Sequence, residues 1–160
     1  MSAPSAMPKV RRFFLALLCL GGIHLAAPWP GPQAVLNTFL ALGLAPGFSS
    51  PLAGLAWAAA GGWVLEGTLR LYPHLGGTAF GNMLACLLAY ALALRWPPHA
   101  LKPYWGRQAA LTLIHTLLVH VSVVFAAGFH VWGTGWLWSL LFTPVWATLA
   151  LRLHPPLHRK

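Results

Sequence analysis

Long apolar segments run through almost the whole chain, and a single acidic residue, Glu66, interrupts them. A soluble domain carries about a quarter of its residues as charged side chains, whereas charged residues make up 7% of this chain and hydrophobic residues 58%. So little charge is not enough to solvate the surface of a globule of 160 residues. The chain is therefore predicted to be an all-α polytopic membrane protein, in which several helices cross the bilayer.

Turn-forming residues divide the apolar sequence into six predicted transmembrane helices. Together they are expected to form a single integral membrane domain over residues 1–160. The predicted spans cover residues 12–27, 33–48, 51–71, 76–95, 108–129 and 134–153.

The first two segments each have an alternative interpretation. The first follows a basic lead, as a signal peptide does, but Pro28 disfavours cleavage and favours a retained helix. The second, from Gln33 to Ala45, is about 20 Å long as a helix, which is short of a bilayer core of about 30 Å. It is either a short tilted span that continues past a kink at Pro46 or a re-entrant piece. Its polar residues, Asn37 and Thr38, are placed to bond to a neighbouring helix.

The basic residues predict the orientation, because cytoplasmic loops of membrane proteins are enriched in Lys and Arg. With six spans and a cytoplasmic N-terminus, nine of the ten Lys and Arg residues lie inside, and Arg70 lies outside. If the second segment does not cross the membrane, four of the Lys and Arg residues lie inside and six lie outside. The pattern therefore favours six spans in the cytoplasmic (inner) membrane with both termini in the cytoplasm. Since the basic residues cluster at span ends and form no separate face, no binding to nucleic acid is expected.

Small residues recur at every fourth position in the third and fourth spans. The first row consists of Gly54, Ala58 and Gly62, and Glu66 and Arg70 continue it at the same spacing. The second row consists of Gly77, Gly81, Ala85, Ala89 and Ala93. Residues four apart share one helix face, and rows of Gly and Ala allow two backbones to approach closely in lipid. We therefore expect a tightly packed hairpin. The residues expected to serve helix packing or partner binding are Gly54, Gly62, Glu66, Arg70, Gly77, Gly81 and Ala85.

Glu66 and Arg70 lie four residues apart near the outer end of the third span, a spacing that allows an ion pair on one helix. An acidic residue inside a membrane is a candidate functional group by default. Near the interface, however, such a pair is partly hydrated and neutralises itself. A structural or partner-docking role is therefore favoured over proton or substrate coupling.

Polar residues form two adjacent strips on the fifth span. Thr112, Thr116 and His120 share one face, and His115 and Ser122 form the neighbouring strip. Such strips usually make hydrogen bonds between helices, which contribute about 0.6 kcal/mol each in a membrane protein. The alternative is a polar pocket for a ligand, formed by Thr112, His115, Thr116 and His120.

Combinations of residues typical of enzymes or metal sites are not found in this sequence. No two of the eight His residues lie four apart within a predicted helix. Catalysis by paired carboxylates is excluded, because the chain has one acidic side chain. We therefore predict a protein that is not an enzyme and that uses no cofactor or metal.

From Pro51 to Tyr90 the sequence resembles the MreD family of bacterial rod shape-determining membrane proteins. In that family a Gly-rich third span ends in an acidic residue, usually Asp, and a short turn with a Leu-Gly step leads to a fourth span that ends near a Tyr. The matching residues here are Pro51-Leu-Ala-Gly54, Gly61-Gly62, Glu66-Gly67, Leu75-Gly76 and Ala89-Tyr90. Glu66 stands in the place of the usual Asp. Chain length, six spans and basic ends also fit the family.

This resemblance implies both a fold and a role. The family is similar in architecture to the six-helix substrate-binding subunits of energy-coupling-factor transporters. Its role is that of a non-enzymatic component of the elongasome, which binds the single-span protein MreC and helps direct sidewall peptidoglycan synthesis and rod shape. The RodA–penicillin-binding-protein synthase is a further expected partner. The alternative is that the chain is itself the substrate-binding subunit of a small-molecule, vitamin-type transporter.

Overall fold

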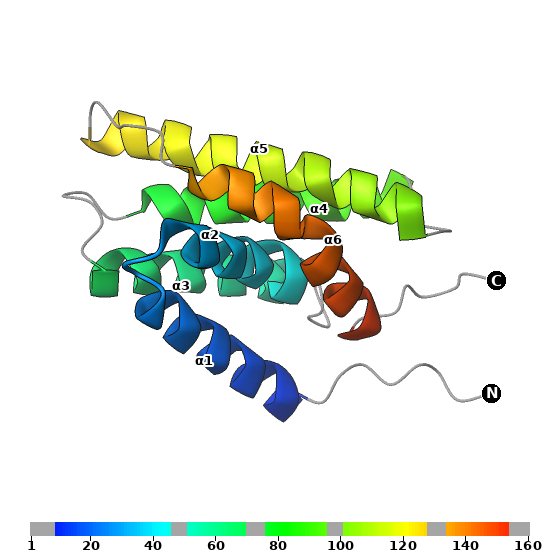
Figure 1. Ribbon diagram of the computed structural model, residues 1–160, viewed down its shortest axis with the longest axis horizontal. Helices are drawn as coiled ribbons and strands as arrows, with labels where there is room; N and C mark the ends of the chain where they lie inside the picture. The colour runs from blue at the N-terminus through cyan, green and yellow to red at the C-terminus, as the bar shows by residue number, and fades with distance from the viewer. Residues whose placement is uncertain (1–8, 46–50, 70–75, 96–100, 128–133, 154–160) are drawn as a thin grey trace.

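The computed structural model describes residues 9–45, 51–69, 76–95, 101–127 and 134–153, and within these ranges the chain is helical throughout apart from short turns. The helices are α1 (Lys9–Leu25), α2 (Pro30–Thr38), α3 (Pro51–Leu69), α4 (Gly77–Arg95), α5 (Leu101–Ala127) and α6 (Gly135–Leu153). A π-helical segment, η1 (Phe39–Leu44), directly continues α2. The predicted all-α class is thus confirmed. The helices run back and forth along the bundle, so that α1 begins and α6 ends at the same end (Figure 1).

Two of these helices, α4 and α6, are long and apolar enough to cross a membrane by length and composition. A shorter apolar stretch, Phe13–Leu25, lies within α1. These helices suggest a membrane location only weakly, and the predicted six-span topology stays a prediction.

The second helix lies in the middle of the bundle. α2 packs against α1 and α6, and η1 contacts α1, α3, α4 and α6. All six residues of η1 are buried, and Leu40 is completely inaccessible to solvent. The segment from Gln33 to Ala45, predicted as a short span or a re-entrant piece, is thus helical without a break as far as Leu44. Its η1 part is buried among the other helices, and its α2 part is mostly half-buried. The N–H group of Phe39 still bonds to the carbonyls of Val35 and Leu36, and the π-helical pattern that follows, with bonds to the carbonyl five residues back, widens the helix locally.

Helix α5 differs most from its predicted bounds. The sequence suggested a polar connection from Arg95 to Arg107, whereas α5 already begins at Leu101. Pro103 lies in its first turn, where the missing backbone N–H costs no helical hydrogen bond. The helix therefore continues beyond its apolar part, and its first two turns carry basic and aromatic side chains.

Helix α6 bends near its middle. It contains Pro144, which removes one helical hydrogen bond and pushes the preceding turn away. The second half of α6 accordingly turns away from the direction of the first half, while α5 continues straight (Figure 1).

Candidate functional site in the helical core

Glu66 joins α3 to the start of α4. Its side chain is 1% exposed, and its two carboxylate oxygens accept hydrogen bonds from the backbone N–H groups of Gly76 and Thr78. N–H groups in the first turn of a helix have no partner within it, and this end of a helix carries partial positive charge. The buried carboxylate is therefore stabilised by the N-terminal end of α4. The prediction that Glu66 is partly hydrated is wrong, because its side chain is buried. Arg70, its predicted partner, lies outside the described residues.

Glycine at position 76 is required by the turn that holds Glu66. Gly76 has a φ angle of 121°, a backbone conformation that residues with a Cβ rarely adopt. The turn thereby presents the Gly76 N–H group to the Glu66 carboxylate. At the same end of α3, the Thr68 hydroxyl is hydrogen-bonded to Nε2 of His24, which links α3 to α1.

Backbone contact between α3 and α4 occurs at Gly62. A Cβ added at Gly62 would lie 2.5 Å from the Cα atom and 2.6 Å from the nitrogen of Ala79. Gly81 makes the corresponding contact between α4 and α5, where an added Cβ would lie 3.0 Å from the backbone nitrogen of Val119. Gly77 is less restricted, since its nearest neighbour, Ser122, would be 3.4 Å away. Gly62 and Gly81 of the two small-residue rows thus lie at close helix–helix contacts.

Gly54 leaves room for a hydrogen bond between α4 and the end of the central helix. The Tyr90 hydroxyl donates to the carbonyl of Ala45 over 3.1 Å. A Cβ at Gly54 would overlap the Tyr90 hydroxyl and lie 2.6 Å from the Ala45 oxygen. Ala58 and Ala85, further along the two rows, are completely buried.

Three helices meet at a buried hydrogen-bond chain around Asn82. The Asn82 side-chain oxygen accepts from Nε2 of His115 on α5 over 2.7 Å, and its amide nitrogen donates to the Ala58 carbonyl on α3 over 3.4 Å. Because Nε2 donates, Nδ1 of neutral His115 is an acceptor. This Nδ1 atom is buried and has no hydrogen-bond partner among the described residues.

Hydroxyl groups from α2, α5 and α6 lie beside this chain and form a polar layer with it. The Thr143 hydroxyl donates to the Ser139 carbonyl over 2.7 Å and lies 3.3 Å from the Thr112 hydroxyl, and the Thr38 hydroxyl lies 3.4 Å from the Ser139 hydroxyl. All four side chains are buried. Thr112 also precedes His115 by one helical turn, so the two hydrogen-bond groups lie next to each other on α5. This polar layer consists of Thr38, the Ala58 carbonyl, Asn82, Thr112, His115, Ser139 and Thr143.

The predicted polar pocket on α5 is brought together only in part. Thr112 and His115 belong to the polar layer. The Thr116 hydroxyl instead donates to the Thr112 carbonyl of its own helix over 2.9 Å, and the Nδ1–H group of His120 donates to the Thr116 carbonyl over 2.8 Å. These two residues therefore satisfy backbone carbonyls within α5.

Asn82, Ser139 and Thr143 were not among the site residues predicted from the sequence. A signal for each was present, since Asn82 shares a four-residue row with Thr78 and Cys86, and Ser139 and Thr143 lie four apart. Polar side chains that share one face of an otherwise apolar helix indicate a buried contact.

Two shallow grooves lie on the outer surface formed by the described residues. The larger, of about 500 Å³, lies between α4 and α5 and is lined by Gly77, Phe80, Leu118, Val121, Ser122 and Phe125. The second, of about 430 Å³, lies between α5 and α6. Among the described residues, no group of three His, Cys, Asp or Glu side chains is placed to hold a metal ion.

The candidate site is thus a set of contacts that fixes the positions of neighbouring helices. It comprises the Glu66 hydrogen bonds, the glycine contacts and the polar layer. The chain matches no protein-family model, no curated protein and no solved structure.

Proposed function

We propose that the chain is a non-enzymatic membrane scaffold of the bacterial elongasome, with six spans in the inner membrane and both termini in the cytoplasm. It binds an MreC-like single-span membrane protein and helps direct sidewall peptidoglycan synthesis. The RodA–penicillin-binding-protein synthase is a further proposed partner. The proposal starts from the MreD-like pattern at Pro51 to Tyr90.

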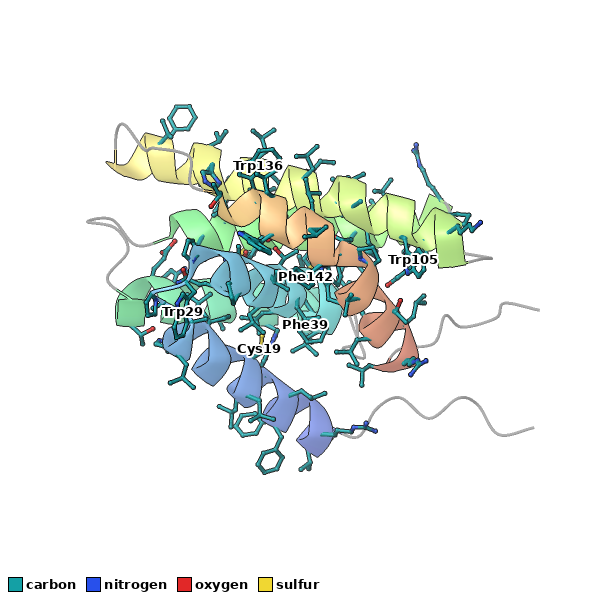
Figure 2. All side chains as sticks on the ribbon, in the orientation of Figure 1. Cys19, Trp29, Phe39, Trp105, Trp136 and Phe142 are labelled. Atoms are coloured by element: carbon teal, nitrogen blue, oxygen red, sulfur yellow. The ribbon has the colours of Figure 1, made fainter. Side chains whose placement is uncertain are left out.

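Surface composition supports the membrane part of the proposal. Large apolar side chains point outward along several helices, among them Leu18, Phe80, Phe125, Leu141 and Val145. Soluble proteins rarely expose continuous apolar surface of this kind, whereas lipid tails favour it. Trp29 and Trp105 lie toward opposite ends of the bundle (Figure 2), as expected of aromatic residues at the two membrane interfaces.

The observation that carries the scaffold role is the filled interior. A carrier subunit needs space for a substrate among its helices, but here the buried residues of η1 occupy the middle of the bundle. Phe39 lies among the surrounding helices (Figure 2). Interactions with partners are therefore expected on the outer surface.

The groove between α4 and α5 is the surface that we propose for the partner helix. Its lining combines the small residues Gly77 and Ser122 with apolar side chains from both helices. Small residues between apolar walls let a second helix approach closely in lipid. Gly77, predicted to serve packing or partner binding, makes only ordinary contact with Ser122.

Affinity purification of the tagged chain in mild detergent, with mass spectrometry of the co-purifying proteins, tests this proposal. We expect an MreC-like single-span protein. Val121→Trp fills the groove and is expected to abolish capture. Val124→Trp is the matched control, because Val121 and Val124 are 42% and 41% exposed, and Val124 does not line the groove. Equal capture by both variants would reject the groove as the docking surface.

The polar layer favours a second candidate function, that of a transporter's substrate-binding subunit. The buried Nδ1 atom of His115 has no hydrogen-bond partner among the described residues, and a small polar ligand is one group that would supply a donor. Recovery of an ATPase module in the same purification, without a single-span partner, would support this carrier and contradict the scaffold.

A further inference from the structure

The second surface groove has one cationic side chain at its end. It is lined by Trp105 of α5 and by Pro144, Val145, Thr148, Leu149 and Arg152 of α6. The bend at Pro144 turns the second half of α6 away from α5 (Figure 1), and the groove lies beside this second half. The groove is therefore apolar along its length and positively charged at the end where α6 terminates.

A hydrogen bond holds Trp105 in place within the groove. The indole N–H group donates to the Thr148 hydroxyl over 3.1 Å, and that hydroxyl in turn donates to the Pro144 carbonyl over 2.7 Å. The indole N–H group and the Thr148 hydroxyl thus both have hydrogen-bond partners within the protein. What remains of these two side chains at the groove is mainly apolar surface. Val145 and Leu149 add exposed aliphatic side chains on α6. This surface is suited to a hydrocarbon chain rather than to a polar ligand.

No acidic side chain of the protein is placed to neutralise Arg152. Glu66 is the single acidic side chain of the chain, and it is buried against the first turn of α4. Arg152 lies in the last turn of α6, at the end of the bundle where α4 ends and α5 begins (Figure 1). This exposed guanidinium is therefore left without an acidic side chain of the protein as its counter-ion, and an external anion can take that place.

We propose that this groove binds one anionic phospholipid, with an acyl chain along Val145 and Leu149 and the phosphate on Arg152. Basic residues at the cytoplasmic ends of transmembrane helices are suited to phosphate head groups, and a guanidinium donates two hydrogen bonds to phosphate oxygens. A volume of about 430 Å³ falls in the range of sites for small organic molecules, about 300 to 1,000 Å³. The inference rests on the proposed membrane location but not on the scaffold role.

Native mass spectrometry of the full chain, purified in detergent and titrated with phosphatidylglycerol or phosphatidylethanolamine, tests the site. We expect the unmodified protein to retain one phosphatidylglycerol in preference to phosphatidylethanolamine. Arg152→Gln should weaken phosphatidylglycerol binding about fivefold. Arg95→Gln, which removes an exposed charge at the same end of the bundle but outside the groove, should leave the binding unchanged.

A second pair of variants tests the acyl part of the site. Val145→Trp fills the groove and should weaken phosphatidylglycerol binding, whereas Leu141→Trp, one turn earlier and outside the groove, should not. Both positions tolerate a large side chain, since they are 66% and 67% exposed. Equal effects of Arg152→Gln and Arg95→Gln would overturn the proposal by showing general attraction of anions, and so would equal effects of the two Trp variants. The lipid-binding test and the partner-capture test are independent. If the lipid site is wrong, Val121→Trp and Val124→Trp should still differ in partner capture, so failure of the lipid site is distinguishable from failure of the scaffold role.

Discussion

The single acidic side chain of this protein is buried, and burial of a charge is costly unless hydrogen bonds compensate it. Glu66 obtains that compensation from two backbone N–H groups at the start of α4. The same contact satisfies helix-end donors that would otherwise be unpaired. We infer that Glu66 is chiefly a connection between α3 and α4.

Replacing Glu66 by Gln is expected to destabilise the protein by about 2 kcal/mol. The amide group retains one oxygen acceptor but points a donor at the second backbone N–H group. Because the backbone supplies the partners, Glu66→Gln combined with Arg70→Gln should be no more stable than Glu66→Gln alone. Thermal unfolding in detergent, followed by circular dichroism, measures this. Rescue by the second substitution would show instead that the ion pair with Arg70 dominates.

Asn82 is a second residue on which several helices depend. Asn82→Leu removes the bonds to His115 and to the Ala58 carbonyl, and we expect a loss of about 1 kcal/mol from two interhelical hydrogen bonds. Thr116→Val is the control, because the Thr116 hydroxyl bonds within its own helix. Its effect should stay within about 0.5 kcal/mol. If the two variants unfold at the same temperature, the polar layer does not contribute to stability.

At the scale of helices, two glycines of α3, Gly62 and Gly67, differ in how closely another helix approaches them. Gly62 lies against the backbone of Ala79, whereas an added Cβ at Gly67 meets nothing within 4 Å. A methyl group at position 62 must therefore move a whole helix, but at position 67 it enters open space.

Gly62→Ala is accordingly expected to destabilise the protein by roughly 1 to 3 kcal/mol. Gly67→Ala on the same helix should be neutral or stabilise it by about 0.5 kcal/mol, since alanine favours helix more than glycine does. Chemical unfolding of the two purified variants in detergent provides the comparison. A loss of stability at both positions would attribute the effect to glycine itself and not to close packing.

Most helices were predictable from the sequence, because turn residues such as Pro28 and Pro51 separate the apolar segments clearly. The central position of α2 and η1 was not predictable. A helix in lipid is apolar both toward its neighbours and toward the acyl chains, so its sequence lacks the polar face that marks the exterior of a soluble helix. The partners of Glu66 were hidden for another reason, since they are backbone groups and leave no side-chain pattern.

At the scale of the whole molecule, the described helices form a bundle whose interior is occupied by the π-helical segment η1. In the proposed membrane location, this accounts for a segment of about 20 Å, because protein rather than lipid surrounds its η1 part. We therefore expect other molecules to dock in the outer grooves. The proposed orientation puts the ends of α4 and α6 and the start of α5, with their basic residues, on the cytoplasmic side.

The central claim is that all six helices cross the membrane and that both termini are cytoplasmic. Single cysteines in place of His74 and Ala100 test it most directly. The native thiols, Cys19 and Cys86, are buried and should contribute little background. A membrane-impermeant maleimide applied to intact spheroplasts should label position 74, and it should label position 100 only after permeabilisation. Labelling of both positions from the same side of the membrane would contradict the account.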